Sequence, residues 1–418
     1  MTAPSLWRHA DFLKLWAGQT VSELGSVVTR TAVPLVALLV LGAGPLQMAL
    51  LVVAGSLAVL LVGFFAGAWV DRLPRRPLLI ASDATRALIL FSIPIAYGAG
   101  VLRMEQLYLV AFVEGCLGSL FDAAYPAYVP SLIGLDRVVE GNSRLATSSS
   151  IAEIGGPGLA GGMVQLVSAP FAILVDAVSF VVSAVSLLLI RAPEPPRPAR
   201  AVATPIRHEI LEGLQLVRRH RVLFPIALRS VVAHVAGSFY GVLYTIYLIQ
   251  DLHLTPFLLG IVVSAGGVGS LVGSLFASRV IRSLGLGPAL VWTATGAAIL
   301  GVLTPLAEGP LLVATAMVLL PQLVGDGLQT IEGVAELSLI QGLSPDRILG
   351  RVNATFEVFS HGIAYPIGAL AAAGVAGAIG VRGGIALGWA GMAVSILFLV
   401  LSPLPRIREP SDGAALSG

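Results

Sequence analysis

Long apolar runs, separated by short polar or Gly- and Pro-containing breaks, follow one another along almost the whole chain. A helix that crosses a bilayer needs about 20 predominantly apolar residues, and these runs have that length. The pattern therefore predicts twelve membrane-spanning helices and leaves no room for a large soluble domain. In the first half of the chain, helices are expected near residues 15–40, 46–70, 78–99, 106–130, 143–167 and 170–190. In the second half, they are expected near residues 223–249, 256–281, 288–307, 311–336, 351–378 and 383–403.

The composition agrees with a membrane protein and argues against other classes. Of the 418 residues, 56% are hydrophobic and 11% are charged, whereas soluble domains carry about 25% charged residues. The net charge of +2 does not indicate nucleic-acid binding, because the basic residues have a topological explanation. The single cysteine, Cys116, cannot form an intramolecular disulfide, and the sequence shows no metal-ligand spacing. We therefore expect no metal and no cofactor.

No phosphate loop or nucleophile constellation is found in the sequence. The run Gly266-Gly-Val-Gly269-x-x-x-Gly273 superficially resembles a nucleotide-binding loop, but it lies inside an apolar run with no strand before it. Helix packing is the better interpretation of these glycines. The chain is therefore predicted not to be an enzyme.

The positions of lysine and arginine predict which side each loop faces, because basic residues collect on the cytoplasmic side. With the N-terminus inside, 20 of the 25 basic residues fall in cytoplasmic segments. Only Arg103 and Arg382 fall outside, and Arg30, Arg86 and Arg229 lie within helices. The chain is thus predicted to be a multi-pass protein of the bacterial inner (cell) membrane, with both termini in the cytoplasm.

A proline-rich stretch, Arg191 to Arg200, divides the chain into halves of similar length. We predict an N-terminal six-helix bundle at 1–190, a cytoplasmic linker at 191–222, a C-terminal six-helix bundle at 223–405 and a cytoplasmic tail at 406–418. The halves also resemble each other, since Ser131-Leu-Ile and Ser338-Leu-Ile are 207 positions apart. A repeat with an even number of spans predicts two bundles related by an axis along the membrane normal, with a substrate site between them.

The loop after the second predicted helix carries a motif, Gly67-Ala-Trp-Val-Asp71-Arg72-Leu-Pro74-Arg75-Arg76. It resembles the signature of the major facilitator superfamily, Gly-x-x-x-Asp-Arg-x-Gly-Arg-Arg, with Pro74 in place of glycine. The resemblance implies an all-α fold of twelve transmembrane helices in two pseudo-symmetric six-helix bundles. It also implies that a charged cluster latches the two halves on the cytoplasmic side; the alternative is that the cluster only anchors the loop and fixes topology. The candidate gating residues are Gly67, Asp71, Arg72, Arg75, Arg76, Asp83 and Arg86.

The fifth predicted helix contains a dense glycine run, Glu153-Ile-Gly-Gly156-Pro157-Gly-Leu-Ala-Gly161-Gly162. Small residues permit close helix contact, and a proline can kink the helix. The run resembles the Gly-Pro-x-x-Gly-Gly element of proton-coupled exporters, with the double glycine one position later. Together with Asp83-x-x-Arg86 and the Phe121-Asp-Ala-Ala-Tyr-Pro126 region, this helix resembles the subfamily that includes macrolide efflux pumps and the enterobactin exporter. The alternative is glycine packing with no bearing on transport direction. The candidate packing residues are Gly156, Pro157, Gly161 and Gly162.

Ionisable side chains inside a bilayer are costly and normally face the protein interior or a water-filled path. Most of them lie on predicted helices one, four, five, seven, ten and eleven, which line or flank the cavity in this superfamily. A carboxyl group that binds a proton in one state and releases it in another would couple transport to protons. Interhelical hydrogen bonding is the alternative role. The proton-coupling candidates are Glu153, the leading one, followed by Glu23 and Asp122, and the pair Glu357 and His361.

Polar and aromatic stripes indicate a substrate cavity. Gln322, Asp326 and Gln329 lie on one face of the tenth predicted helix, and Tyr240 and Tyr244 lie on one face of the seventh. Aromatic faces with few fixed charges suit bulky amphipathic molecules, although the tyrosines could instead form a belt at the membrane interface. The cavity candidates are Arg30, His234, Tyr240, Tyr244, Gln322, Asp326 and Gln329.

The sequence thus favours a secondary transporter that exports small amphipathic drugs or metabolites by proton antiport with alternating access. A dedicated siderophore or metabolite exporter is the alternative; a proton-coupled importer and a non-transporting receptor are further ones. The expected partners are a small-molecule substrate, protons and the lipid bilayer, with no nucleic acid. The protein is expected to be a monomer.

Overall fold

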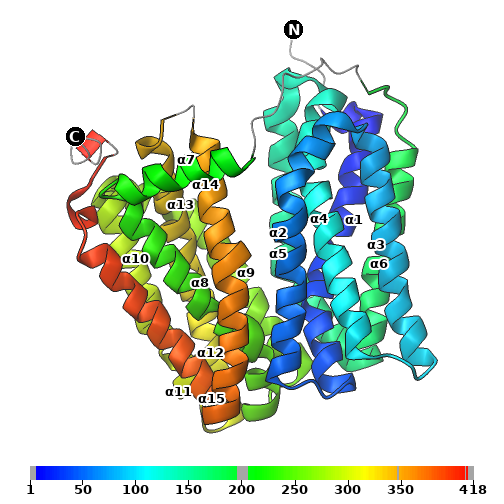
Figure 1. Ribbon diagram of the computed structural model, residues 1–418. Coiled ribbons are helices and arrows are strands. Elements are labelled where there is room, and N and C mark those ends of the chain that lie inside the picture. Colours follow the sequence, from blue (N-terminus) through cyan, green and yellow to red (C-terminus); the bar gives the residue numbers. More distant parts are fainter. Residues whose placement is uncertain (1–5, 195–205, 346–347, 410, 413–418) are drawn as a thin grey trace. The chain divides into compact units, whose positions relative to one another are not determined.

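The computed structural model describes residues 6–194, 206–345, 348–409 and 411–412 (Figure 1). Throughout these residues the regular secondary structure is helical, without a β-strand. The all-α fold expected from the apolar runs is therefore confirmed.

The first half of the chain forms six long helices close to the predicted positions. They are α1 (Ala10–Leu35), which continues as the π-helical turn Val36–Val40, α2 (Pro45–Arg72), α3 (Arg75–Gly98), α4 (Met104–Ile133), α5 (Val138–Val167) and α6 (Ala169–Leu188). Only Leu73 and Pro74 separate α2 from α3. The helix α3 starts earlier than predicted because Pro74, whose φ is −59°, stands directly before its first turn.

After α7 (Ile206–Arg219), the second half forms the remaining helices. They are α8 (Leu223–Ile246), α9 (Pro256–Leu284), α10 (Leu286–Gly301), α11 (Leu303–Leu306), α12 (Leu311–Leu320), α13 (Asp326–Leu343), α14 (Leu349–Glu357) and α15 (Tyr365–Val400). Three π-helical segments extend or join them: Tyr247–Asp251 follows α8, Pro321–Gly325 joins α12 to α13, and Val358–Ala364 joins α14 to α15. At Gly380 the backbone leaves the helical region, with φ at +80°. Because glycine adopts positive φ without strain, Gly380 ends the eleventh predicted span and starts the twelfth.

Ten helical stretches of the described chain are long and apolar enough to cross a membrane. One of them, Leu349–Val400, contains the break at Gly380 and accounts for two spans. The helix α5 is not among the ten, although its 30 residues give it sufficient length. Glu140, Arg144 and Glu153 lower its apolar character. These two points reconcile the ten stretches with twelve helices.

The chain folds as two compact units. The first consists of the described residues of Met1–Gln47, Ala54–Ala201 and Thr255–Ser264. The second consists of those of Met48–Val53, Val202–Leu254 and Ala265–Gly418.

Small residues allow the helices of the first unit to approach one another. The helix α1 packs along α5 and α6, and α3 packs along α4 and α6. At Gly25 of α1, an added Cβ would lie 2.6 Å from Oδ1 of Asp176 on α6. Lipid tails are as apolar as the helix surfaces, so close van der Waals packing of this kind replaces the hydrophobic effect as the main source of helix association.

Glycines also allow close helix packing in the second unit. The helix α8 packs along α15, and α10 packs along α13. The run from Gly266 to Gly273 lies in α9, and an added Cβ at Gly273 would lie 2.9 Å from Cα of Gly327 in α13. Helix packing, the predicted role of this glycine run, is therefore confirmed.

A buried histidine starts α8. Nδ1 of His220, outside the membrane-spanning segments, accepts hydrogen bonds from the backbone N–H groups of Val222 (3.2 Å) and Leu223 (3.3 Å). Burial lowers the pKa of His220 from its ordinary value of about 6.5. Since the unfolded chain binds this proton more readily, the contribution of His220 to stability is complete above pH about 6.5 and is lost as the pH falls below it.

Candidate functional site

The second unit contains a cavity of about 570 Å³. Its walls come from α8, α10, α13 and α15, and from the π-helical segments Pro321–Gly325 and Val358–Ala364. Cavities of this size hold drug-sized ligands. Six of the seven predicted cavity residues line it, namely His234, Tyr240, Tyr244, Gln322, Asp326 and Gln329. The structure therefore brings together polar and aromatic side chains that lie far apart in the sequence.

Prolines shape two walls of this cavity. Pro321 begins the π-helical segment that carries Gln322, and Pro366 follows the segment that carries His361. Proline has no N–H to donate to the preceding turn, and wide π-helical turns of this kind recur at functional sites. The local sequence thus explains why the helix is irregular where these side chains reach the cavity.

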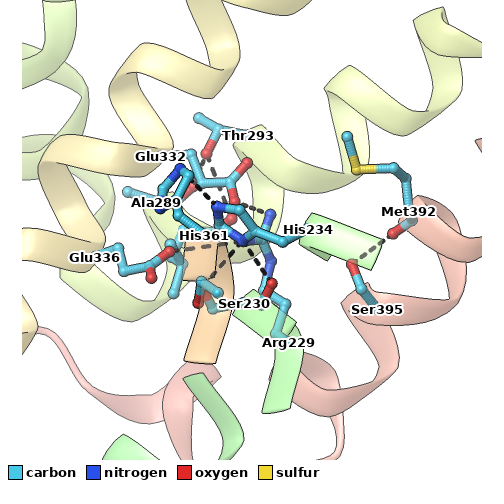
Figure 2. A network of polar contacts seen from close by, with 12 residues as sticks. Arg229, Ser230, His234, Ala289, Thr293, Glu332, Glu336, His361, Met392 and Ser395 are labelled. Atoms are coloured by element: carbon cyan, nitrogen blue, oxygen red, sulfur yellow. Dashed lines mark hydrogen bonds and ion pairs between the residues drawn. The ribbon is translucent and has the colours of Figure 1, made fainter. Parts of the chain in front are cut away.

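A buried ion-pair network lies on the cavity wall (Figure 2). The guanidinium of Arg229 on α8 pairs with Glu332, and its Nη1 lies 3.6 Å from Oε2 of Glu336, both on α13. The side chains of Arg229 and Glu332 are only 12% and 7% exposed. Asp326 also lines the cavity, so the described lining residues include three carboxyl groups and one guanidinium, that of Arg229. The cavity therefore has an excess of acidic groups.

Two histidines meet at the same wall. Nε2 of His234 on α8 lies 3.2 Å from Nε2 of His361, and the ring centroids are 4.3 Å apart. Nδ1 of His234 lies 2.7 Å from the backbone carbonyl oxygen of Ser230. Nδ1 of His361 lies 3.4 Å from Oε2 of Glu357, one turn earlier. The structure thus places His361 and Glu357, which the sequence paired as proton-coupling candidates, beside the cavity residue His234.

Aromatic rings and Asp326 form the rest of the wall. The rings of Tyr240 and Tyr244 lie 6.0 Å apart. Gly241 leaves room for Tyr365, since a Cβ there would lie 3.1 Å from Cζ of that ring. Gly266 of α9 similarly leaves room for the carboxyl group of Asp326. A ligand in this cavity would therefore meet tyrosine faces and carboxyl groups.

The leading proton-coupling candidate lies in the first unit. Glu153 on α5 forms an ion pair with Arg30 on α1, and both side chains are about half exposed, at 47% and 61%. Glu23 accepts a hydrogen bond from the Ser149 hydroxyl at 3.2 Å, and the side chain of Asp122 is exposed. Arg30, predicted to lie in a substrate cavity, therefore pairs with a predicted proton carrier.

The motif between α2 and α3 is described in part. Gly67, Asp71 and Arg72 lie in the last turns of α2, and their side chains are outside the described residues. Arg75 donates to the backbone carbonyl of Ala127 (2.6 Å), and Arg76 donates to the carbonyls of Leu187 (3.0 Å) and Leu188 (2.9 Å) at the end of α6. Cations stabilise the C-terminus of a helix, where carbonyl groups lack partners. These described contacts anchor the loop within the first unit, and gating stays a prediction.

Asp83 and Arg86 belong to a buried cluster. Arg86 on α3 pairs with Glu114 on α4, with Nε at 2.9 and 3.0 Å from the two carboxylate oxygens. Its guanidinium also lies 4.1 Å from the ring centroid of Phe180. Asp83 and Asp176 are fully buried nearby. Asp83 and Arg86 were predicted as site residues, whereas Glu114 and Asp176 were not, although all four are ionisable residues inside apolar runs.

Two of the predicted packing glycines in α5 lie in close contacts within the first unit. An added Cβ at Gly156 would lie 2.7 Å from Cβ of Val27 on α1, and at Gly161 it would lie 3.0 Å from the carbonyl carbon of Pro256. Gly162 is less constrained, with the ring of Phe257 at 3.7 Å. Pro157 lies inside α5, which continues without a break.

The sequence profile of the Major Facilitator Superfamily matches residues 15–369. The chain belongs to this superfamily. The family resemblance seen in the loop motif is therefore confirmed, and the protein is a membrane transporter of this family.

Individual members of the superfamily are similar to this chain over most of its length. The multidrug efflux pump Tap of Mycolicibacterium fortuitum is 26% identical and covers 95% of this chain and 96% of its own. The MFS-type transporter YvqJ of Bacillus subtilis (strain 168) is 24% identical over 68% of each chain. Among solved structures, an inward-facing bacterial homologue of the iron transporter ferroportin has a TM-score of 0.75 at 18% identity, covering 95% of this chain and 99% of that one. The nucleoside transporter NupG has a TM-score of 0.74 at 13% identity, covering 94% of this chain and 98% of that one. At such identities the structural likeness establishes the fold alone.

Proposed function

We propose that this transporter exports small amphipathic molecules, drugs or metabolites, in exchange for protons, by alternating access. The observation that carries the proposal is the cavity of the second unit, which combines tyrosine rings with carboxyl and imidazole groups. Aromatic rings bind organic molecules of varied shape, and carboxyl and imidazole groups can bind protons. The same cavity thus contains aromatic rings that can bind the substrate and carboxyl and imidazole groups that can bind the exchanged protons.

The charge of the cavity favours neutral or cationic substrates. Among the described residues that line it, Asp326, Glu332 and Glu336 face one guanidinium, that of Arg229. Tyrosine faces also attract organic cations. An anionic siderophore would meet an excess of acidic groups. This balance favours drug-like or cationic metabolites over the alternative of a dedicated siderophore exporter.

Two observations support export rather than import. The glycine and proline run of α5 resembles the element of proton-coupled exporters, and Gly156 and Gly161 lie in close contacts there. The similar protein Tap is a multidrug efflux pump. Both observations agree with the predicted direction.

The proposal is tested in everted membrane vesicles with an acidic lumen. We expect a cationic amphipathic dye such as ethidium to accumulate in the lumen and to release protons from it, in vesicles with the protein but not in vesicles without it. A catechol-type anion is expected to cause no proton release. Release caused only by the catechol would favour the siderophore exporter, movement of protons and substrate in the same direction would favour an importer, and the absence of any transport would favour a receptor.

Glu153 is expected to be essential for coupling in that assay. A proton on Glu153 would cancel its charge and break the ion pair with Arg30, so protonation and helix contact are linked at this point. We expect Glu153→Gln to lower the accumulation driven by the pH gradient at least about tenfold, a difference of about 1.4 kcal/mol in coupling. Glu308→Gln is the matched control, since Glu308 also pairs with an arginine, Arg382, but is 75% exposed. A full response of Glu153→Gln to the gradient would show that another group carries the proton.

A further inference from the structure

Two imidazole rings on the cavity wall face each other through the same atom, Nε2. Their Nε2 atoms are 3.2 Å apart, which is a hydrogen-bond distance. A neutral imidazole has one N–H donor and one acceptor nitrogen. The hydrogen-bond partner of one nitrogen determines which of the two nitrogens carries the hydrogen. The surroundings of the two Nδ1 atoms therefore determine whether a hydrogen lies between the two Nε2 atoms.

The nearest group to each Nδ1 atom is an acceptor, since the Ser230 hydroxyl lies farther from Nδ1 of His234, at 3.4 Å, and is 2.8 Å from the Ser360 hydroxyl. Nδ1 of His234 is 2.7 Å from the backbone carbonyl oxygen of Ser230, so this nitrogen carries a hydrogen. Nδ1 of His361 is 3.4 Å from the carboxylate of Glu357, so it also carries a hydrogen. In two neutral rings with these tautomers, both Nε2 atoms would be acceptors, and their lone pairs would repel at 3.2 Å.

One additional proton removes this conflict. A proton on either Nε2 makes that ring an imidazolium, which donates to the Nε2 of the other ring. A second proton would place two positive rings with centroids 4.3 Å apart, which is unfavourable at any dielectric constant found in a protein. The geometry of the two rings therefore favours one proton on the two Nε2 atoms over no proton and over two protons.

The charged groups around the pair also favour one positive charge. Glu357 lies one turn before His361. Arg229, on the same helix as His234, is paired with Glu332 and Glu336 from α13 (Figure 2). Asp326 lies on the same cavity wall. These groups comprise four carboxyl groups and one guanidinium, so a proton on the histidine pair reduces an imbalance of charge.

We propose that His234 and His361 form a one-proton site in which a single proton is shared between their Nε2 atoms. This inference deepens the proposed function, on which it rests for the role of the proton, because it names a second proton-binding site beside the substrate cavity. The side chain of His361 is 56% exposed, so the proton can reach the site. A bound proton makes the cavity wall less negative and thereby weakens its attraction for a cationic substrate, which is the relation an exchanger needs.

The site is tested by nuclear magnetic resonance of the full-length protein in lipid nanodiscs, with ¹³C and ¹⁵N label in its six histidines. Spectra are recorded before and after addition of EDTA. Spectra of His234→Gln and His361→Gln assign the two rings. We expect both rings to carry hydrogen on Nδ1 and to lose one shared proton together, in a single step, as the pH rises. In His361→Gln, the imidazolium signal of His234 is expected to be lost at pH values where the wild type shows it. The control His253→Gln, in the loop after α8, should leave the pair unchanged.

Three results would overturn the inference. They are titration of the two rings as independent groups, a neutral ring with hydrogen on Nε2, and a signal of the pair that changes on removal of metal by EDTA. None of these readouts needs a substrate or a pH gradient. Failure of this experiment is thus distinguishable from failure of the vesicle assay, which tests the proposed function itself.

Discussion

Replacement of Arg229 by glutamine is expected to abolish transport and to lower the free energy of unfolding by about 3–5 kcal/mol, the cost of removing one partner from a buried ion pair. The Arg229 side chain is 12% exposed and pairs with Glu332, which is 7% exposed. Without the guanidinium, Glu332 and Glu336 would remain side by side on α13 with no cation between them. The cavity wall would then reorganise or bind protons in place of the arginine.

A charge-balanced variant separates loss of charge compensation from loss of side-chain volume. Arg229→Gln with Glu332→Gln removes one charge of each sign, so we expect the double variant to recover more than half of the lost unfolding free energy. Unfolding is measured by denaturant titration of the purified protein in micelles, and transport is measured in the vesicle assay. A double variant as unstable as the single one would mean that Arg229 acts by packing of its alkyl chain and not by its charge.

The twelve helices could be predicted from the sequence because the length of each apolar run is fixed by the thickness of the bilayer. Helix ends could be predicted well where a glycine interrupts an apolar run, and less well where a helix begins with charged residues. The break at Gly380, with φ at +80°, falls between two predicted spans, whereas α3 begins at Arg75 rather than near residue 78. The first turn of α3 contains Arg75 and Arg76, which precede the apolar run, so apolar periodicity alone places the start of this helix too late.

The candidate site could be predicted in part. Polar positions spaced by three or four residues on one helix share a face, so Gln322, Asp326 and Gln329 could be grouped from the sequence, and all three line the cavity. Partners on different helices could not be predicted, because an ion pair such as that of Arg229 with Glu332 depends on which helices pack together. Glu336 continues the same stripe at helical spacing and also lines the cavity, whereas Glu332 lies off that stripe, so only its partner, Arg229, shows that it belongs to the site.

The glycines show the same division between local pattern and tertiary contact. The sequence marked the run in α5 as a packing surface, and Gly156 and Gly161 do lie in close contacts. Gly155, next in the chain to Gly156, has no atom within 4 Å of an added Cβ. Composition identifies a helix with a small-residue surface, but the neighbouring helix decides which glycine on that surface cannot be replaced.

Replacement of Arg86 by glutamine is expected to destabilise the first unit as strongly, by about 3–5 kcal/mol. Arg86 is the guanidinium paired with Glu114, and its side chain is 14% exposed. Asp83 and Asp176 are fully buried and interact electrostatically with it. Three carboxyl groups from α3, α4 and α6 therefore depend on one cation, so its removal affects the contacts among all three helices.

Two variants make this prediction specific. Arg86→Gln with Glu114→Gln leaves the formal charge of the cluster as in the wild type, and we expect it to recover most of the stability measured by denaturant titration. Arg103→Gln removes an exposed arginine and is expected to change the unfolding free energy by less than about 0.5 kcal/mol. If Arg86→Gln were as mild as Arg103→Gln, Glu114 could not be ionised in the folded protein. The cluster would then hold its carboxyl groups together with protons in place of the ion pair, and Arg86 would contribute chiefly through its contact with the Phe180 ring.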